Sequence, residues 1–185
     1  MEPAKDKLVE AILFLITEAA ERKREVTQYD ILKSLFFADK SHMNRFGRPI
    51  TFDNYVAMQH GPVPSFAYEL LKNESDPGWL GVGALPWECV PGHLNKPNIC
   101  TYRNPKRQPS DDVLSESDKE ALSDALATVM SLTFGQIRKL THDDPAYTAA
   151  WGEGESGNAP MSYGMMFDVP DFEEAEHLQF VSQHL

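Results

Sequence analysis

The chain holds many side chains that could act as acids, bases or metal ligands, but their spacing matches no established catalytic or metal-binding motif. Six histidines are spread along the 185 residues: His42, His60, His93, His142, His177 and His184. They form neither an H-E-x-x-H pair nor a compact set of His, Asp and Cys ligands. A G-x-S-x-G elbow, a P-loop, a dinucleotide fingerprint and a C-x-x-C pair are also missing from the sequence. We therefore expect no cofactor and no metal.

The densest cluster of titratable residues is His142-Asp143-Asp144. Asp144 precedes a proline, so its carboxylate suits a helix cap better than a metal site. An enzyme, such as a hydrolase, would need His60 and His142 to converge with Asp39 or Asp143 around one pocket. We expect no such convergence and predict that the protein is not an enzyme.

The stretch "HGPVP", residues 60–64, suits a catalytic turn around His60, a phosphate-binding bend or a rigid corner between two helices. We favour the corner. Asp53 can cap a short helix through "NYVAMQ", Gly61 can close that helix, and Pro64 can open the next one. His60 would then pack or hydrogen-bond rather than catalyse.

Helical periodicity and capping residues predict a mainly α chain. Apolar residues recur at helical spacing from Lys7 to Glu21, and a second helix begins at Thr27 with Asp30 and ends at Gly47. Further helix starts are predicted at Ser115, Thr133 and Asp144. We expect a compact, single-domain helical bundle with a helix-turn-helix-like N-terminal pair and a small β-hairpin or irregular insert.

The N-terminal pair, residues 7–23 and 28–45, makes a DNA-binding transcriptional regulator an alternative function. Its second helix offers few bases to a phosphate backbone: Lys33, Lys40 and Arg45. The whole chain carries 28 acidic and 17 basic residues, for a net charge of −11. Direct binding to nucleic acid is therefore disfavoured, and a basic partner is mildly favoured. Asp39 shares the apolar face of this helix, so we expect it to be partly buried and to brace neighbouring backbone.

Residues 74–112 are rich in glycine and proline and are expected to form an insert, in which "WECV" and "ICTYR" could pair as a hairpin. Trp79 and Trp87 should pack this insert against the helices. Cys89 and Cys100 could face each other across the hairpin, but we favour reduced thiols because nothing suggests export. The N-terminal apolar run is too short for a membrane span and resembles no signal peptide, so we predict a cytoplasmic protein that does not contact a membrane.

The run "TQYDILKSLFFADKSHMNRFGRPITFDNYVAMQHGPVP" resembles the Panacea domain, also called the SocA-like antitoxin domain. The resemblance is collinear over about 45 residues, with weaker echoes to residue 168. We therefore expect a domain at 1–168 and an acidic, helical C-terminal segment at 169–185. The matching positions are Thr27, Leu32, Leu35, Phe37, Ala38, Asp39, Gly47, Pro49, Ile50, Asp53, Tyr55, Ala57, Gly61, Pro62 and Val63. Met58-Gln59-His60 departs from the pattern, which usually has a tryptophan and an aromatic residue there.

The resemblance implies a non-enzymatic, mainly helical antitoxin that neutralises a cognate toxin protein by direct binding. One member of the family acts as an adaptor that delivers its toxin to a protease, so a protease such as ClpXP is a further expected partner. Large amphipathic or aromatic side chains often dominate such interfaces. The candidate toxin-binding residues are Tyr68, Trp79, Trp87 and Trp151.

Overall fold

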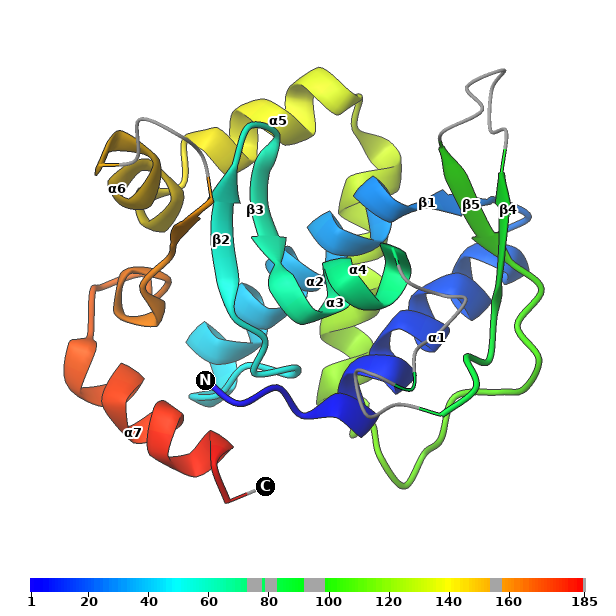
Figure 1. The fold of residues 1–185 in the computed structure, drawn as a ribbon, viewed down its shortest axis with the longest axis horizontal. Coiled ribbons are helices and arrows are strands. Elements are labelled where there is room, and N and C mark those ends of the chain that lie inside the picture. Colours follow the sequence, from blue (N-terminus) through cyan, green and yellow to red (C-terminus); the bar gives the residue numbers. More distant parts are fainter. Residues whose placement is uncertain (73–77, 79–82, 92–98, 154–157, 185) are drawn as a thin grey trace.

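Three long helices form the centre of the molecule (Figure 1). The computed structural model describes residues 1–72, 78, 83–91, 99–153 and 158–184. Helices α1 (Lys5–Glu21), α2 (Gln28–Phe46) and α4 (Glu116–Ser131) pack against one another. The predicted ends of α2 are confirmed. Thr27 and its N3 aspartate form a capping box, and Gly47 closes the helix with a φ of 75°.

Shorter helices surround this centre: α3 (Ser65–Lys72), α5 (Phe134–His142), α6 (Pro145–Glu153), the 3-10 turn η3 (Tyr163–Met165) and α7 (Phe172–Ser182). The predicted caps are confirmed here as well, because Ser115 begins α4 and Thr133 begins α5, each with a complete capping box. Asp144 accepts the backbone N–H of Ala146 at 2.9 Å and so caps α6. The mainly α class therefore follows from local signals that the sequence displays.

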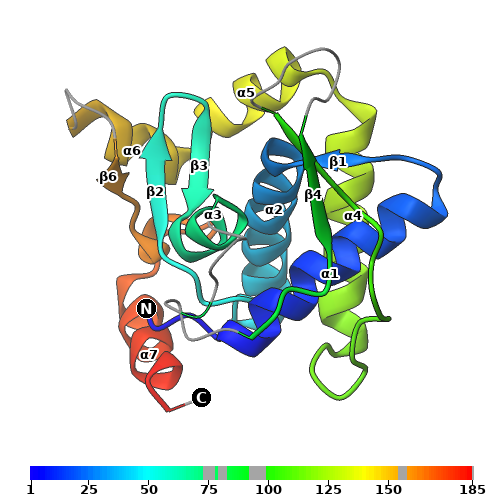
Figure 2. The ribbon, with the colours of Figure 1, turned by 45° about the vertical axis from the view of Figure 1, so that its right-hand side comes forward.

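Two small antiparallel sheets lie on either side of α2 (Figure 2). One has the order β1-β5-β4, from β1 (Val26–Thr27), β5 (Cys100–Arg103) and β4 (Glu88–Pro91). The other has the order β3-β2-β6, from β3 (Gly61–Pro64), β2 (Tyr55–Met58) and β6 (Ala159–Pro160). The predicted hairpin in the insert is thus confirmed as β4 and β5.

The expected helical corner at "HGPVP" is wrong. "YVAM" is strand β2, and a turn at Gln59 and His60 leads directly into strand β3, with Met58 opposite Gly61. Burial alternates along β2, which is the period of a strand with one covered face. Gly61 has a φ of 98°, so its left-handed conformation serves a hairpin turn instead of a helix end.

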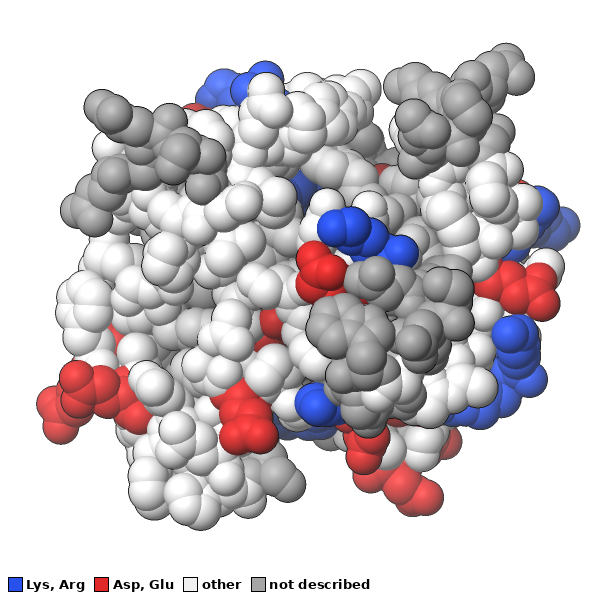
Figure 3. All heavy atoms as spheres, viewed as in Figure 1, with Lys and Arg blue, Asp and Glu red and all other residues white. Residues whose placement is uncertain are grey.

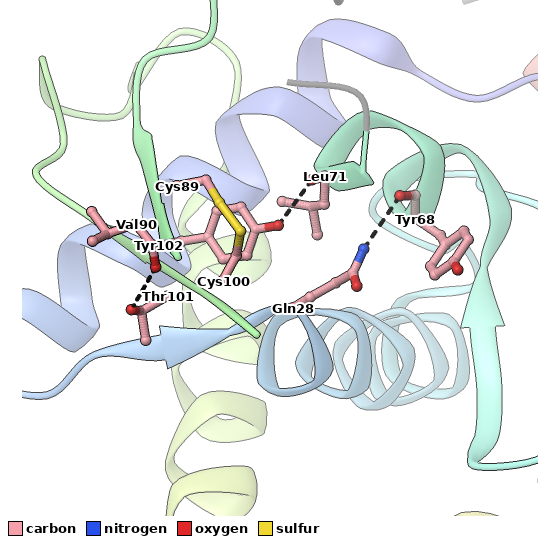
Figure 4. The surroundings of a disulfide bond; sticks show 8 residues. All are labelled: Gln28, Tyr68, Leu71, Cys89, Val90, Cys100, Thr101 and Tyr102. Atoms are coloured by element: carbon pink, nitrogen blue, oxygen red, sulfur yellow. Dashed lines mark hydrogen bonds between the residues drawn. A yellow bond between two sulfur atoms is a disulfide. The ribbon is translucent and has the colours of Figure 1, made fainter. Parts of the chain in front are cut away.

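The expectation of reduced thiols is also corrected, because Cys89 and Cys100 form a disulfide between β4 and β5 (Figure 4). Cys89 lies opposite Tyr102, so the two cysteines are diagonal neighbours on the sheet face that carries Tyr102. The Tyr102 hydroxyl donates to the Leu71 carbonyl at 2.9 Å and ties this hairpin to the end of α3.

The termini approach each other at one end of the molecule, where the Glu2 N–H donates to Ser182 Oγ at 3.0 Å. The remaining described core falls into two clusters, one between α1, α2 and α4 and one between α2, α6 and η3. None of the helices in the described ranges combines the length and apolar character that crossing a membrane would require.

Candidate protein-binding site

The carboxylate of Asp39 fixes the path of the chain after α2. It is fully buried and accepts the backbone N–H groups of Ile50 and Thr51 at 2.8 and 3.0 Å. It also accepts the hydroxyl of Thr51 and that of Tyr55, the latter at 2.8 Å. Burial raises the pKa of Asp39, and these four hydrogen bonds oppose that effect. The predicted bracing role of Asp39 is confirmed.

Asp53 caps a helix, but a different one from the helix that the sequence suggested. Its carboxylate accepts the N–H groups of Phe66 and Ala67 at 2.9 and 2.8 Å, in the first turn of α3. The Tyr163 hydroxyl donates to the Asp53 carbonyl at 2.6 Å. Burial raises the pKa of Asp53 to about 7, against the lowering effect of its backbone donors. Hairpin β2–β3 and helix α3 are therefore positioned by one buried carboxylate.

The other residues of the family pattern also have structural roles, at helix ends, in a turn or in the core. Thr27 and Gly47 define the ends of α2, and Gly61 defines the hairpin turn. The remaining pattern residues are buried apart from the half-buried Phe37: Leu32, Leu35, Ala38, Pro49, Ile50, Tyr55, Ala57, Pro62 and Val63. The collinear pattern thus mainly specifies the fold, and two of its residues, Leu32 and Val63, also line the pocket described below.

Hairpin β2–β3 lies over a buried lysine. Lys33 is 1% exposed, and its Nζ donates to the Pro62 carbonyl at 2.6 Å. The same Nζ lies 5.3 Å from the centre of the Tyr29 ring. Burial lowers the pKa of Lys33 to about 7. A Cβ on Gly61 would collide with Thr141 Oγ1 and lie 3.0 Å from Lys33 Nζ, so only glycine allows this close approach.

A pocket of about 280 Å³ opens beside this lysine. Its walls come from the first turns of α2, the tip of hairpin β2–β3 and helix α3. The lining side chains include Tyr29, Leu32, Lys33, Met58, His60, Val63 and Tyr68. We call it the Lys33 pocket. A hydrogen bond joins two walls of the pocket: Gln28, at the start of α2, donates through its side-chain amide to the Tyr68 carbonyl at 3.5 Å (Figure 4).

Three aromatic side chains from different elements meet beside the pocket. Phe134, the first residue of α5, is 51% exposed, and its ring centre lies 4.9 Å from that of Tyr29 and 5.6 Å from that of His60. We call Tyr29, His60 and Phe134 the aromatic rim. On this side of the molecule, the atoms over the hairpin β2–β3 are mostly uncharged, whereas acidic atoms gather around α7 (Figure 3). An exposed aromatic group beside an apolar pocket is typical of protein-binding surfaces.

The predicted toxin-binding residues differ in position and in exposure. Tyr68 lines the Lys33 pocket and is partly exposed. Trp151 is half-buried and stacks on Tyr147 with ring centres 5.7 Å apart, away from that pocket. Trp87 is 2% exposed and belongs to the core, which confirms its expected packing role and makes its ring unavailable to a partner, so it is not a toxin-binding candidate. Trp79 lies outside the described residues.

Of the residues required by the enzyme alternative, His60 and His142 lie near each other, but Asp39 and Asp143 do not line the Lys33 pocket. His60 lines the Lys33 pocket, whereas Asp39 is enclosed by its four donors. The His142 ring stacks on Tyr147 at 4.5 Å, and Asp143 is exposed and pairs with Lys139 at 2.5 Å. Among the described residues, no group of three or more His, Cys, Asp or Glu side chains is arranged to hold a metal ion.

Sequence reasoning missed Lys33, Tyr29 and Phe134. Tyr29 and Lys33 are four residues apart in a predicted helix, so their position on one face was available from the sequence. The position of Phe134 directly after the cap Thr133 was available too. Their convergence with the hairpin was not, because it depends on contacts between α2, α5 and β3.

These features define a mainly helical domain whose candidate site is an aromatic-lined pocket. A family model described as "Antitoxin SocA-like, Panacea domain" matches residues 31–147, from the first turn of α2 to the start of α6. The chain belongs to this family, which points to a role in a toxin–antitoxin system. Comparison with curated proteins and with solved structures found no match.

Proposed function

We propose that this protein is an antitoxin that neutralises its cognate toxin by binding it directly through the Lys33 pocket and the aromatic rim. One observation carries the proposal. The side chain of Phe134 is 51% exposed and lies beside the Lys33 pocket. Most of the residues that form this pocket lie within the part of the chain that matches the antitoxin-like family. The role is non-enzymatic, with Tyr68 at the interface and Trp151 as a second, separate contact. A cytoplasmic location is proposed with it, and there the Cys89–Cys100 disulfide would have to form in a reducing environment.

The alternative of a DNA-binding regulator has less support, because the bases of α2 are engaged within the fold. Lys33 is buried, Lys40 pairs with Asp144, and Arg45 pairs with Glu120 at 2.9 Å. A helix that reads DNA needs such side chains free to reach phosphates and base edges. A gel shift with the protein's own promoter, with and without toxin, tests this alternative.

Delivery of the toxin to a protease such as ClpXP is compatible with the proposal. The acidic helix α7 lies at the other end of the molecule from α5, so a second partner has a separate surface available (Figure 1). Toxin half-life in cells with and without the protease tests this role. A half-life that does not depend on the protease restricts the protein to neutralisation by binding.

The decisive experiment is co-expression with each neighbouring open reading frame. We expect one product to arrest growth when expressed alone, to be tolerated with this protein, and to co-purify with it. If none of the neighbouring products is toxic and none co-purifies, the proposal is wrong.

A matched pair of variants locates the interface. Phe134→Ser removes an exposed ring of the aromatic rim, and we expect it to abolish rescue and co-purification. Phe180→Ser removes a ring that is 62% exposed on α7, and we expect rescue to persist. Equal effects of the two substitutions would exclude the aromatic rim as the toxin-binding surface.

A further inference from the structure

The ammonium group of Lys33 has hydrogen-bonding capacity that the fold leaves unused. Lys33, whose pKa is about 7, is an ammonium below that pH; an ammonium has three donors, and Lys33 Nζ uses one of them on the Pro62 carbonyl. Within the described ranges no carboxylate pairs with it, although lysines this deeply buried are almost always paired. The side chain lines the pocket, so an added group could reach the unused donors from there.

The Tyr29 hydroxyl is a second unused donor at the same pocket. Its oxygen is buried and has no hydrogen-bond partner among the described residues. Burial raises the pKa of Tyr29 to about 12, so the phenol is protonated at neutral pH and can donate. A buried hydroxyl without a partner costs stability, so a ligand acceptor there would relieve that cost.

The surroundings of the pocket are locally positive in a chain whose net charge is −11. The pKa of His142 is lowered by burial first and then by the nearby charges of Arg138, Lys33 and His60. The negative charge of Asp30 helps to raise the pKa of Tyr29, but the Asp30 carboxylate already accepts hydrogen bonds from the N–H and the hydroxyl of Thr27. The electrostatic environment therefore favours an anion at this position.

We propose that the Lys33 pocket receives an acidic side chain of the partner protein, flanked by an apolar residue. The carboxylate accepts from Lys33 Nζ and the Tyr29 hydroxyl, and the apolar residue packs against Leu32, Met58 and Val63. The identity of the partner rests on the proposed antitoxin function, whereas the preference for a carboxylate rests on the pocket alone. The interaction would join two charges out of water, which makes it specific for an acidic group over a neutral one.

The preference for a carboxylate can be tested without the toxin. The probes are 3-phenylpropionate and its neutral amide, titrated into the full chain and followed by NMR of the lysine Cε–Hε and tyrosine ring signals. We expect 3-phenylpropionate to shift the Lys33 and Tyr29 signals and the amide to bind about tenfold more weakly. Equal binding of acid and amide would overturn the proposal.

Two variants keep the test independent of misfolding. Lys33→Met retains the length of the side chain without its charge, and we expect acid and amide to bind it equally. Lys139→Met removes an exposed lysine of α5 and should leave the preference for the acid unchanged. A preference for the acid that survives in Lys33→Met would also overturn the proposal.

The co-expression assay then tests the assignment of the pocket's occupant separately from the antitoxin function. If Lys33→Met folds and fails to neutralise the toxin, the assignment of the partner's acidic side chain stands. If Lys33→Met neutralises as well as the wild type, that assignment falls while the antitoxin function remains. If no neighbouring product is toxic but the carboxylate preference is observed, the antitoxin function fails and the occupant of the pocket is not a toxin.

Discussion

At the residue scale, Asp39 concentrates four hydrogen bonds on one buried carboxylate. We predict that Asp39→Asn destabilises the protein by roughly 1–3 kcal/mol, because the new NH₂ group faces donors instead of accepting from them. The measurement is urea unfolding. Asp143→Asn, which alters an exposed ion pair, is the control and should change stability by less than about 1 kcal/mol. Similar losses in both variants would show that the buried network adds no stability.

Lys33 should give the protein an unusual dependence of stability on pH. Its folded pKa of about 7 lies below the ordinary value of 10.5, so the unfolded chain binds the extra proton. The stability linked to neutral Lys33 is therefore present above pH 10.5 and is lost as the pH falls to 7. We predict that the unfolding free energy of Lys33→Met, relative to that of the wild type, rises by about 4 kcal/mol as the pH falls from 10.5 to 7.

Most of this pH range lies above the folded pKa of Asp53, where Asp53 contributes little to the pH dependence. The folded pKa of Asp53 is raised to about 7 from 3.8, so its contribution is present below pH 3.8 and is lost as the pH rises through 7. Above pH 7.5 the comparison of Lys33→Met with the wild type mainly reports Lys33. Unfolding free energies of the two proteins that run parallel from pH 7.5 to 10.5 would contradict the prediction.

At the element scale, hairpin β2–β3 depends on one residue without a side chain. Gly61→Ala would strain a left-handed backbone and collide with Thr141, and we predict a loss of roughly 2–4 kcal/mol in unfolding free energy. Gly135→Ala is the matched control, because nothing lies within 4 Å of a Cβ there and the residue is helical. It should stabilise the protein by up to about 1 kcal/mol. A neutral Gly61→Ala would mean that the hairpin can move away from α5.

The disulfide joins strands β4 and β5, and these support α3 through Tyr102. We predict that replacing both Cys89 and Cys100 by serine lowers the unfolding free energy by about 2–3 kcal/mol, because a short loop is released in the unfolded chain. The wild type should lose a similar amount in a reducing agent, and the double variant should not respond to it. If thiol labelling finds two free cysteines in the purified, non-reduced protein, this prediction is overturned.

The sequence predicts those elements that are set by residues close together in the chain, and it fails for those that depend on contacts between distant residues. Caps such as Thr27 and Ser115 act within one helical turn, and the structure has them where the sequence puts them. Strand β2 is only four residues long, too short for its alternation to exclude a helix, and its partners include β6 about 100 residues later. The disulfide was missed because the expectation rested on cellular compartment instead of strand register. The burial of Lys33 depends on a backbone carbonyl 29 residues away.

At the scale of the whole molecule, α7 packs on the body through few side chains. Leu178 is 3% exposed, and Ser182 accepts the N–H of Glu2. We predict that residues 1–168 fold as a domain without α7, with a loss of roughly 2–4 kcal/mol from the exposed apolar surface. Urea unfolding should show one transition, and the toxin should still be neutralised because α5 lies far from α7 (Figure 1). Loss of cooperative unfolding would place α7 inside the domain.

The two prolines of strand β3 have a consequence for how any partner can bind. The carbonyls of Tyr55 and Ala57 accept N–H groups from the β6 side, so Val56 and Met58 face β3 and bond to Val63 and Gly61. Pro62 and Pro64 therefore occupy the outward positions, where they offer no N–H, and the outward Pro62 carbonyl already accepts from Lys33. The β3 edge of this sheet, whose residues are buried, therefore cannot template an additional strand. Aggregation through this edge is thereby discouraged, and a partner at the neighbouring pocket must be selected by its side chains instead of by a shared backbone ladder.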